Sequence, residues 1–248
     1  MDATPLISII TVTYNAGKVI GKTLESLKSQ SFGDFEHLVV DGASRDNTLA
    51  LVKDAALKQS VVISEPDHGL YDAMNKGLRL AKGKYVLFLN AGDAFHSPDS
   101  LKLYASEATK GKDIIYGDTE IVDIRGKLIA PRHLSVPSTL DRDSFSNGML
   151  ICHQAFMVKK ELAPEYDLAY SFSADYDWCV KCISKAHRGR CANLQAVTID
   201  YLSDGLTDKN KWKSLRERFR IMQKHYGLGK TLLKHIGFLS RAAKRGSI

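Results

Sequence analysis

Regular alternation between short apolar runs and helix-like segments constrains the fold of this chain more than any other feature of its sequence. The apolar runs are rich in β-branched residues, which is typical of strands covered on both faces. They span residues 6–14, 35–40, 61–64 and 85–90. The segments between them, residues 19–29, 47–57 and 70–82, carry apolar side chains at helical spacing. This alternation predicts an α/β fold with a mostly parallel, Rossmann-like sheet flanked by helices and built from right-handed βαβ units.

The second half of the chain is less regular. We expect a strand pair at residues 113–122 and 127–132, a strand at 149–158, a helix at 175–186 and a strand at 196–201. From residue 211 the pattern becomes strongly helical, with one apolar stripe on an otherwise basic helix. The stripe consists of Trp212, Leu215, Phe219, Met222 and Tyr226.

The positive charge of the chain is concentrated at its C-terminal end. The formal net charge is +7, yet residues 209–248 hold 12 lysines and arginines against one acid, Glu217, and the first 208 residues are net negative. We therefore divide the chain into an α/β domain at residues 1–208 and a basic amphipathic helical tail at 209–248. The tail either docks on the domain or binds an anionic membrane surface. No recognised nucleic-acid-binding module accompanies it, so we expect no nucleic acid partner.

Composition and missing motifs exclude several classes of protein. With 44% hydrophobic and 25% charged residues, the chain is neither disordered nor collagen-like. Its apolar runs are much shorter than the roughly 20 residues of a membrane span. The N-terminus resembles a strand rather than a secretory signal, so we expect a cytoplasmic protein, peripheral on the inner face of the membrane if the tail binds lipid. The dinucleotide, P-loop and serine hydrolase motifs are all missing.

Polar residues follow the predicted strands at the edge where open α/β sheets bind their ligands. Asp41 ends the second strand, the third leads to Asp67, and the fourth leads through Asn90 to Asp93. One such carboxylate is commonly a helix cap, but several on one rim repel one another unless a cation or polar ligand lies among them. Mg²⁺ or Mn²⁺ with a bound diphosphate suits this pattern, because such ions take one or two carboxylates together with phosphate oxygens.

Five motifs occur in a specific order: ISIITVTYN, VVDGASRDNT, SEPDHGLYDAMNKGLRLAKGKYVLFLNAGD, CHQAFM and SADYDWCV. In this combination the chain resembles glycosyltransferase family 2, whose members have the GT-A fold. It is most similar to the bacterial branch that assembles exopolysaccharide, colanic acid and O-antigen repeat units. The resemblance covers about residues 5–205, which is most of the predicted α/β domain.

The resemblance implies a site for a nucleotide-diphosphate sugar, most simply a UDP-sugar. One group of residues matches positions that hold the base and ribose, and a second group matches the segment that lines the nucleotide and donor pocket. These groups are Thr13, Tyr14 and Asp41, and Asp67, Asp72 and Asn75. For Asp72 and Asn75, ordinary polarity on a helix surface is the alternative interpretation.

The resemblance also implies a divalent metal, Mg²⁺ or Mn²⁺, that bridges the diphosphate. Asp93 matches the last acid of the family's D-x-D-type motif. The chain departs from the commoner L-D-x-D-D at Asn90 and Gly92, which leaves one carboxylate. Asn90 is a weaker ligand than an acid, so the departure puts an essential role for the metal in doubt.

On the acceptor side, the resemblance implies that Asp175 is the general base. An inverting transfer needs a carboxylate that removes the proton of the acceptor hydroxyl as it attacks from the face opposite the diphosphate. Asp177 is an alternative base or a charge that stabilises the helix start. His153 and Gln154 match a segment near the acceptor or the leaving diphosphate, although His153 is equally well a hydrogen-bonded strand-end residue. The family's G-G-x-S-like loop corresponds to residues 204–207, where an acid makes phosphate contact doubtful.

Together these observations predict an inverting hexosyltransferase of bacterial surface polysaccharide biosynthesis. Its acceptor would be a glycan or oligosaccharide, most simply one linked to polyprenyl diphosphate. Two other classes stay open. A nucleotidyltransferase shares the sheet architecture but carries a denser Gly/Arg/Lys loop after the first strand. A non-catalytic sugar-nucleotide or carbohydrate-binding protein would account for the thinned acidic motif.

Overall fold

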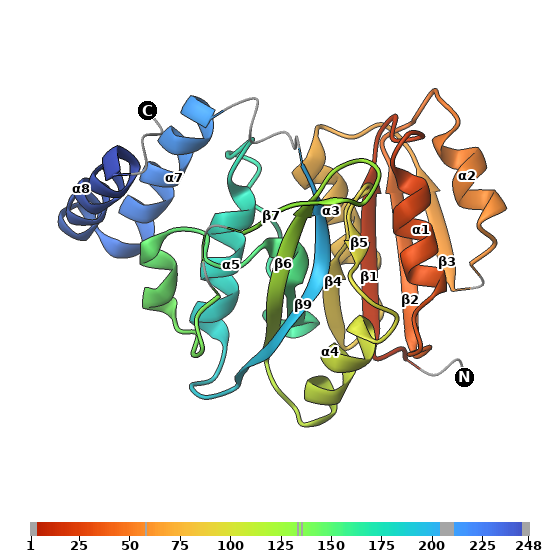
Figure 1. Ribbon diagram of the computed structural model, residues 1–248, viewed down its shortest axis with the longest axis horizontal. Helices are drawn as coiled ribbons and strands as arrows, with labels where there is room; N and C mark the ends of the chain where they lie inside the picture. The colour runs from red at the N-terminus through yellow and green to blue at the C-terminus, as the bar shows by residue number, and fades with distance from the viewer. Residues whose placement is uncertain (1–3, 58, 133, 135, 204–210, 245–248) are drawn as a thin grey trace.

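In the computed structural model, the chain forms a nine-stranded curled sheet with helices on both faces (Figure 1). The structure describes residues 4–244 except 58, 133, 135 and 204–210. The strands are β1 (Ile7–Thr13), β2 (Phe35–Asp41), β3 (Ser60–Ser64), β4 (Tyr85–Phe88), β5 (Ala94–Phe95), β6 (Ile114–Val122), β7 (Leu128–Pro131), β8 (Phe156–Lys159) and β9 (Cys191–Leu202). The α-helices are α1 (Ile20–Lys28), α2 (Thr48–Asp54), α3 (Leu70–Leu80), α4 (Ser100–Thr109), α5 (Ala174–Lys185), α7 (Lys211–Tyr226) and α8 (Leu228–Lys244). Three short 3₁₀ helices are η1 (Arg142–Asn147), η2 (His153–Ala155) and η3 (Lys160–Leu162).

The sheet has the order β3-β2-β1-β4-β8-β6-β9-β5, and β7 pairs with β6. The first four strands are parallel, as the alternating pattern predicted. β8 is inserted antiparallel between β4 and β6, and β6 then runs parallel to β9. The prediction of an α/β fold with a mostly parallel sheet is confirmed.

The core lies on both faces of the sheet because successive strand residues point to opposite sides. From β1, Ile10 packs with α3 and α5 on one face, whereas Ile9 packs with α1 and α4 on the other. The fully buried Trp178 of α5 lies at the centre of the first face and stacks on Tyr166 at a centroid distance of 5.2 Å. Gly77 lets α3 approach β1 closely, because a Cβ atom there would collide with Ile10. Packing on both faces therefore holds in place the strand ends that carry the polar residues.

The helical tail packs against the α/β domain at the end of the molecule opposite β3 (Figure 1). On α7, Ile221 and Met222 are buried in the same cluster as Trp178. The predicted apolar stripe is partly wrong, because Trp212 is 84% exposed and Leu215 50% exposed. Polar contacts set the rotation of the helix instead. Ser214 and Glu217 contact the segment before α5, and His225 contacts Asp177 within α5. The predicted boundary at residues 208 and 209 lies outside the described residues.

The strand predicted at residues 149–158 is also wrong in its first part. β8 begins only at Phe156, and η2 precedes it. The carbonyl oxygens of Met149 and Leu150 accept hydrogen bonds from the Arg132 guanidinium, so they are not available to a neighbouring strand. Helix α4 and the short β5 were not predicted. Within the described ranges, no helix combines the length and apolar character needed to cross a membrane.

Candidate active site

A cavity of about 960 Å³ opens where β1, β6, β9, α3, η2, α5, α7 and the segment after β4 meet. This is the position in which open α/β sheets bind ligands, beyond the carboxyl ends of the parallel strands. Six of the predicted site residues line the cavity together with Asp175, namely Thr13, Tyr14, Asp67, Asp93, His153 and Gln154. Residues from five separate segments of the chain therefore converge on one space.

One end of the cavity lies at the tip of β1. Tyr14 is 65% exposed there, which leaves the ring free to contact a ligand. A Cβ atom on Gly42 would collide with Asp67 Oδ2 and lie 3.3 Å from Tyr14 Cδ2, so the glycine allows these side chains to approach each other. Thr13 Oγ1 is buried and has no hydrogen-bond partner within the described part of the chain. An aromatic face, a carboxylate and a free hydroxyl group suit a planar, hydrogen-bonding ligand.

Asp93 lies deeper in the cavity and is only 4% exposed. Its Oδ1 accepts a hydrogen bond from the Leu202 amide at 2.9 Å, and its Oδ2 accepts one from Gln154 Nε2 at 3.0 Å. Burial raises the pKa of Asp93 to about 7, although both hydrogen bonds act to lower it. A buried carboxylate of this kind gains strongly from a nearby cation.

Two further polar atoms beside Asp93 have no partner among the residues that the structure describes: Asn90 Oδ1 and His153 Nε2. Both side chains line the cavity. His153 is packed among the aromatic rings of Phe88, Tyr166 and Trp178, and burial lowers its pKa. Buried polar atoms of folded proteins are normally hydrogen-bonded, so these two point to a ligand. The Asn90 oxygen and the Asp93 carboxylate both belong to the cavity lining, and both are oxygen donors of the kind that a hard divalent cation prefers.

Asp175 lies in the first turn of α5, on the α5 side of the cavity. It is partly exposed, and the Tyr71 hydroxyl donates a hydrogen bond to its Oδ1 at 3.2 Å. Asp177 does not line the cavity; it is fully buried and paired with His225 Nε2 at 2.7 Å. Of the two acids, only Asp175 is placed to accept a proton from a bound molecule.

Three of the predicted donor-site residues do not line the cavity. Asp41 is fully buried, and its carboxylate accepts hydrogen bonds from Ser44 and from the Ser64 hydroxyl group at 2.7 Å, so it shapes the loop after β2. Asn75 forms two hydrogen bonds with the backbone of Tyr166, at 3.0 and 2.7 Å. Asp72 accepts a hydrogen bond from the backbone of His68 at the start of α3. These side chains already form hydrogen bonds with other groups of the chain.

The structure also adds residues that the motifs did not indicate. Tyr71, Arg132, Ser214 and Arg218 all line the cavity. Tyr71 belongs to the SEPDHGLYDAMN motif, but the motif gives no sign of its contact with Asp175, which lies 104 positions away in the sequence. Ser214 and Arg218 come from α7, so the tail forms part of the cavity wall. The loop at residues 204–207, to which we assigned a doubtful phosphate contact, lies outside the described residues.

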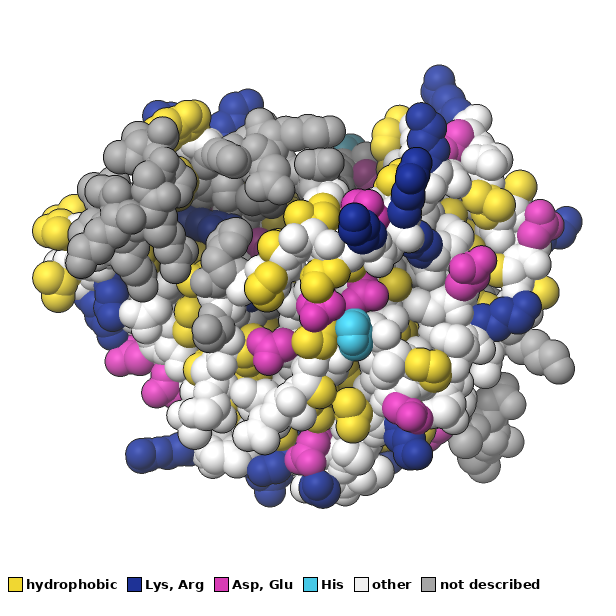
Figure 2. Space-filling view, viewed as in Figure 1, with side chains coloured by type: hydrophobic (Ala, Val, Ile, Leu, Met, Phe, Trp, Pro, Cys, Tyr) yellow, Lys and Arg dark blue, Asp and Glu magenta, His cyan; other side chains and the backbone are white. Residues whose placement is uncertain are grey.

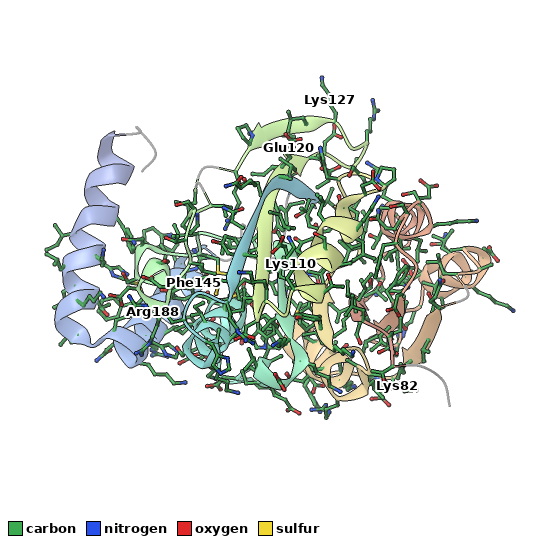
Figure 3. All side chains as sticks on the ribbon, turned by 90° about the horizontal axis from the view of Figure 1, so that it is seen from below. Lys82, Lys110, Glu120, Lys127, Phe145 and Arg188 are labelled. Carbon is green, nitrogen blue, oxygen red and sulfur yellow. The ribbon has the colours of Figure 1, made fainter. Side chains whose placement is uncertain are left out.

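A second group of possible metal ligands lies on the other face of the sheet. Ligand atoms of His96, Glu120 and Asp200 lie within 4.8 Å of one another, and His96 Nδ1 is 2.7 Å from Asp200 Oδ1. Their strand neighbours Thr119 and Tyr201 line the cavity, so alternation turns Glu120 and Asp200 away from it. Figure 2 shows acidic side chains gathered around a histidine on the face where β6 and β9 lie in front. Figure 3 shows Glu120 near β7, whereas Phe145 lies on the side of α7 and α8.

Known proteins show the same fold and sequence pattern. The chain matches the family model described as glycosyl transferase family 2 over residues 8–166. It is 34% identical over 190 residues to a PGL/p-HBAD biosynthesis glycosyltransferase of Mycobacterium tuberculosis, a match that covers 73% of this chain and 71% of that protein.

Two solved structures show the same architecture. TarS 1-349 of S. aureus in complex with UDP-GlcNAc has a TM-score of 0.73 at 20% identity, covering 94% of this chain and 73% of that one. The mannosyltransferase PcManGT of Pyrobaculum calidifontis, in complex with GDP-Man and Mn2+, has a TM-score of 0.63 at 17% identity and covers 100% of this chain and 77% of that one. Both resemblances concern the fold. The family match spans more than half of the sequence, and the chain belongs to glycosyl transferase family 2.

Proposed function

We propose that this glycosyltransferase transfers one hexosyl group from a UDP-sugar, with inversion, to a hydroxyl group of a glycan acceptor. The observation that carries the proposal is the placement of Tyr14, Asp93 and Asp175 along one cavity. Tyr14 follows β1 and Asp175 begins α5, and β4 and β6 lie between these elements in Figure 1. The cavity thus offers a ring for a base, a buried carboxylate near its middle, and an accessible carboxylate on the far side.

The β1 end suits the nucleotide. The exposed Tyr14 ring offers an apolar face to a base, and Thr13 and Asp67 offer polar atoms to the base edge or the ribose. The structural relative TarS 1-349 was solved with UDP-GlcNAc, which supports a uridine nucleotide here. Asp41 acts in this proposal only indirectly, by holding the loop that brings Gly42 against Tyr14 and Asp67.

Asp93 and Asn90 would hold a divalent cation, Mg²⁺ or Mn²⁺. When bound, such an ion supplies positive charge to the departing diphosphate. The relative PcManGT was solved with GDP-Man and Mn2+, which supports a metal in this fold. His153 also lines the cavity, and its Nε2, which has no partner among the described residues, is available to a diphosphate oxygen or to the acceptor. Gln154 orients the Asp93 carboxylate through its side-chain amide.

Asp175 is the proposed general base. It removes the proton of the acceptor hydroxyl while that oxygen attacks the anomeric carbon from the side opposite the diphosphate, which inverts the configuration. Tyr71 holds the carboxylate in place by its hydrogen bond, at the start of α5.

The proposed acceptor is a glycan on a polyprenyl diphosphate carrier, used in bacterial surface polysaccharide biosynthesis, and the proposed location is the inner face of the cytoplasmic membrane. Helix α8 supports a membrane contact, because its outer side exposes apolar residues at helical spacing: Leu228, Leu232, Leu233 and Ile236. Basic residues Arg241, Lys244 and Arg245 follow in the sequence. Charge attraction and apolar insertion together favour an anionic leaflet.

Vesicle sedimentation tests this membrane contact. The protein should co-sediment with anionic vesicles and be released by salt, whereas the double variant Leu233→Glu, Ile236→Glu should remain in the supernatant. Both positions are well exposed, so the variant should fold normally. Equal sedimentation of the two proteins would contradict the membrane contact without affecting the proposed chemistry.

Donor binding and turnover test the central proposal. Thermal stabilisation by UDP-, GDP- and dTDP-sugars in the presence of Mn²⁺ identifies the donor, and UDP-sugars should stabilise most. Slow hydrolysis that releases UDP and a free sugar of inverted anomeric configuration would support the transferase. Release of a sugar phosphate would instead indicate a nucleotidyltransferase, and binding without any turnover would indicate a sugar-nucleotide-binding protein.

A further inference from the structure

Arg218 of α7 differs from the other basic residues of the tail. Its side chain is half-buried and lines the cavity, whereas its helical neighbours Arg216 and Arg220 are exposed. Lys224, six residues further along α7, is paired with Asp167 at 3.3 Å. Arg218 forms no ion pair with any described residue, and its Nε is buried without a hydrogen-bond partner among them. Within the part of the chain that the structure describes, the cavity wall therefore carries a guanidinium group whose buried Nε has no partner.

This arrangement is costly unless a ligand completes it. A buried donor without a partner loses its hydrogen bonds to water and gains nothing in return. A guanidinium group is permanently charged and presents a planar set of donors that matches phosphate oxygens. The second arginine of the cavity, Arg132, has its guanidinium bound to the carbonyl oxygens of Met149 and Leu150. Arg218 is thus the better placed of the two to receive an anion.

The position of Arg218 separates it from the proposed nucleotide end. It lies on α7, which is bound to the segment before α5 by the contact of Ser214 with Ser173 at 2.9 Å. That segment leads directly to Asp175. In Figure 1, α7 lies beyond α5 as seen from β1, whose tip carries Tyr14. An anion at Arg218 would therefore lie on the side of Asp175 from which the acceptor hydroxyl group approaches.

We propose that Arg218 binds a phosphate group carried by the acceptor, close to its reacting sugar. This inference rests on the proposed function, because it takes Asp175 as the residue that faces the acceptor. It extends that function by giving the acceptor side its own anion-binding residue, contributed by the basic tail rather than by the α/β domain. Such a contact orients the acceptor and excludes neutral sugars that lack the phosphate.

Calorimetry on the full chain tests the proposal in two steps. UDP with Mn²⁺ is titrated first, and the UDP-saturated protein is then titrated with farnesyl diphosphate or with inorganic pyrophosphate. The variants are Arg218→Gln, Arg218→Lys and the control Arg216→Gln, which removes an exposed arginine from the same helix. We expect Arg218→Gln to weaken the second binding event by about tenfold or more and to change UDP affinity less than about twofold. Arg218→Lys should retain part of the affinity, and Arg216→Gln should behave as the unmodified protein.

The two probes separate the possible sources of the phosphate. Tighter binding of farnesyl diphosphate than of pyrophosphate supports a lipid carrier, and equal binding supports a phosphate on the glycan itself; either result supports the site if Arg218→Gln removes it. The inference is overturned if neither probe binds the UDP-loaded protein, if Arg218→Gln binds both as well as the unmodified protein, or if it loses UDP affinity to the same degree. Failure of UDP to bind at all would instead reject the proposed function, so the two failures are distinguishable.

Discussion

Asp175 and Asp177 lie two residues apart in the first turn of α5, yet one faces the cavity and the other is sealed beneath α7. Asp177 is fully buried and contacts Lys181, Lys224 and His225. Burial alone would raise the pKa of Asp177, but the hydrogen bonds from His225 and Lys181 outweigh it and hold the pKa at about 2. Asp175 has a single tyrosine partner and remains partly exposed. Asp177 thus anchors the tail, whereas Asp175 is left accessible for the proton transfer that we propose.

Replacement of each acid by its amide should separate these tasks. Asp175→Asn should lower kcat by roughly 10²- to 10⁴-fold with UDP affinity almost unchanged, because the amide cannot accept the proton. Asp177→Asn should lower the free energy of unfolding by about 2 to 3 kcal/mol, because it removes the buried carboxylate that Lys181 and the half-buried His225 contact. Steady-state kinetics and urea unfolding measure the two effects. Loss of turnover in Asp177→Asn at temperatures where it is fully folded, with full turnover in Asp175→Asn, would reverse the assignment.

Metal-dependent donor binding should depend on Asp93 and not on the group on the opposite face. We expect Mn²⁺ to tighten UDP binding to the unmodified protein, and Asp93→Asn to lose about tenfold or more of that gain, because the Asp93 carboxylate is the charged ligand of the proposed metal site. Calorimetry with UDP in the presence and absence of Mn²⁺ measures the difference. Asp200→Asn is the matched control, since Asp200 belongs to the alternative group with His96 and Glu120. If Asp200→Asn instead of Asp93→Asn abolished the metal effect, the metal would have to be reassigned.

The first half of the fold was predictable because its signals are local. Three of the four parallel strands and the three helices between them bury apolar side chains, and their apolar pattern is visible in the sequence without knowledge of the partners. The exception is the edge strand β3, in which Val61 and Val62 are exposed. The face of α7 was not predictable in the same way. Ser214 and His225 turn inward because they bond to Ser173 and Asp177, and such polar contacts leave no apolar period. Residues 149–152 likewise have the sequence pattern of a strand, but the carbonyl oxygens of Met149 and Leu150 accept hydrogen bonds from the Arg132 guanidinium instead.

The candidate site shows the same division. The ends of the parallel strands located Thr13, Tyr14, Asp67 and Asp93 because parallel strands bring their carboxyl ends to one edge. A motif does not reveal whether an acid or amide is already satisfied by the chain itself, which is why Asp41 and Asn75 were expected in the pocket. The sequence does not indicate that Tyr71 contacts Asp175 or that Arg218 lines the cavity, because these placements arise only when α3, α5 and α7 are packed together.

The buried His37 should make the protein sensitive to mild acid. Its ring lies between Thr11 Oγ1 at 3.0 Å and Ser60 Oγ at 2.7 Å, and burial lowers its pKa to about 4. The unfolded chain therefore binds a proton at a higher pH than the folded protein, and stability falls as the pH drops from about 6.5 towards 4. The loss attributable to this histidine should be about 2 to 3 kcal/mol.

Urea unfolding at several pH values between 4 and 7 measures this loss. His37→Gln should flatten the pH dependence of the unfolding free energy by the amount given above, although its stability at pH 7 should itself be lower because the hydrogen bonds to Thr11 and Ser60 are altered. His68→Gln, at an exposed position, should retain the steep dependence. An unchanged slope in His37→Gln would show that the acid sensitivity arises elsewhere.

Glu217, the single acid of residues 209–248, should position the proposed base through the backbone before it. Its Oε1 accepts a hydrogen bond from the Ser171 amide at 2.9 Å, and its Oε2 accepts one from the Phe172 amide at 2.8 Å. These amides lie three and four residues before Asp175, so the two bonds fix the direction in which the chain enters α5. The tail helix thereby acts on the proposed base without touching it.

Glu217→Ala should lower kcat about tenfold, because a small displacement of the base weakens proton transfer, while UDP affinity changes by less than about twofold. Glu217→Gln keeps one acceptor oxygen and should recover part of the rate, which a merely destabilising substitution would not explain. Steady-state kinetics and UDP calorimetry, both below the onset of thermal unfolding, provide the measurements. Glu165→Gln is the control, because Glu165 forms an exposed ion pair with Arg79 whose loss should cost at most about 1 kcal/mol and leave kcat unchanged. Equal kcat values in Glu217→Ala and Glu165→Gln would show that the tail does not position Asp175.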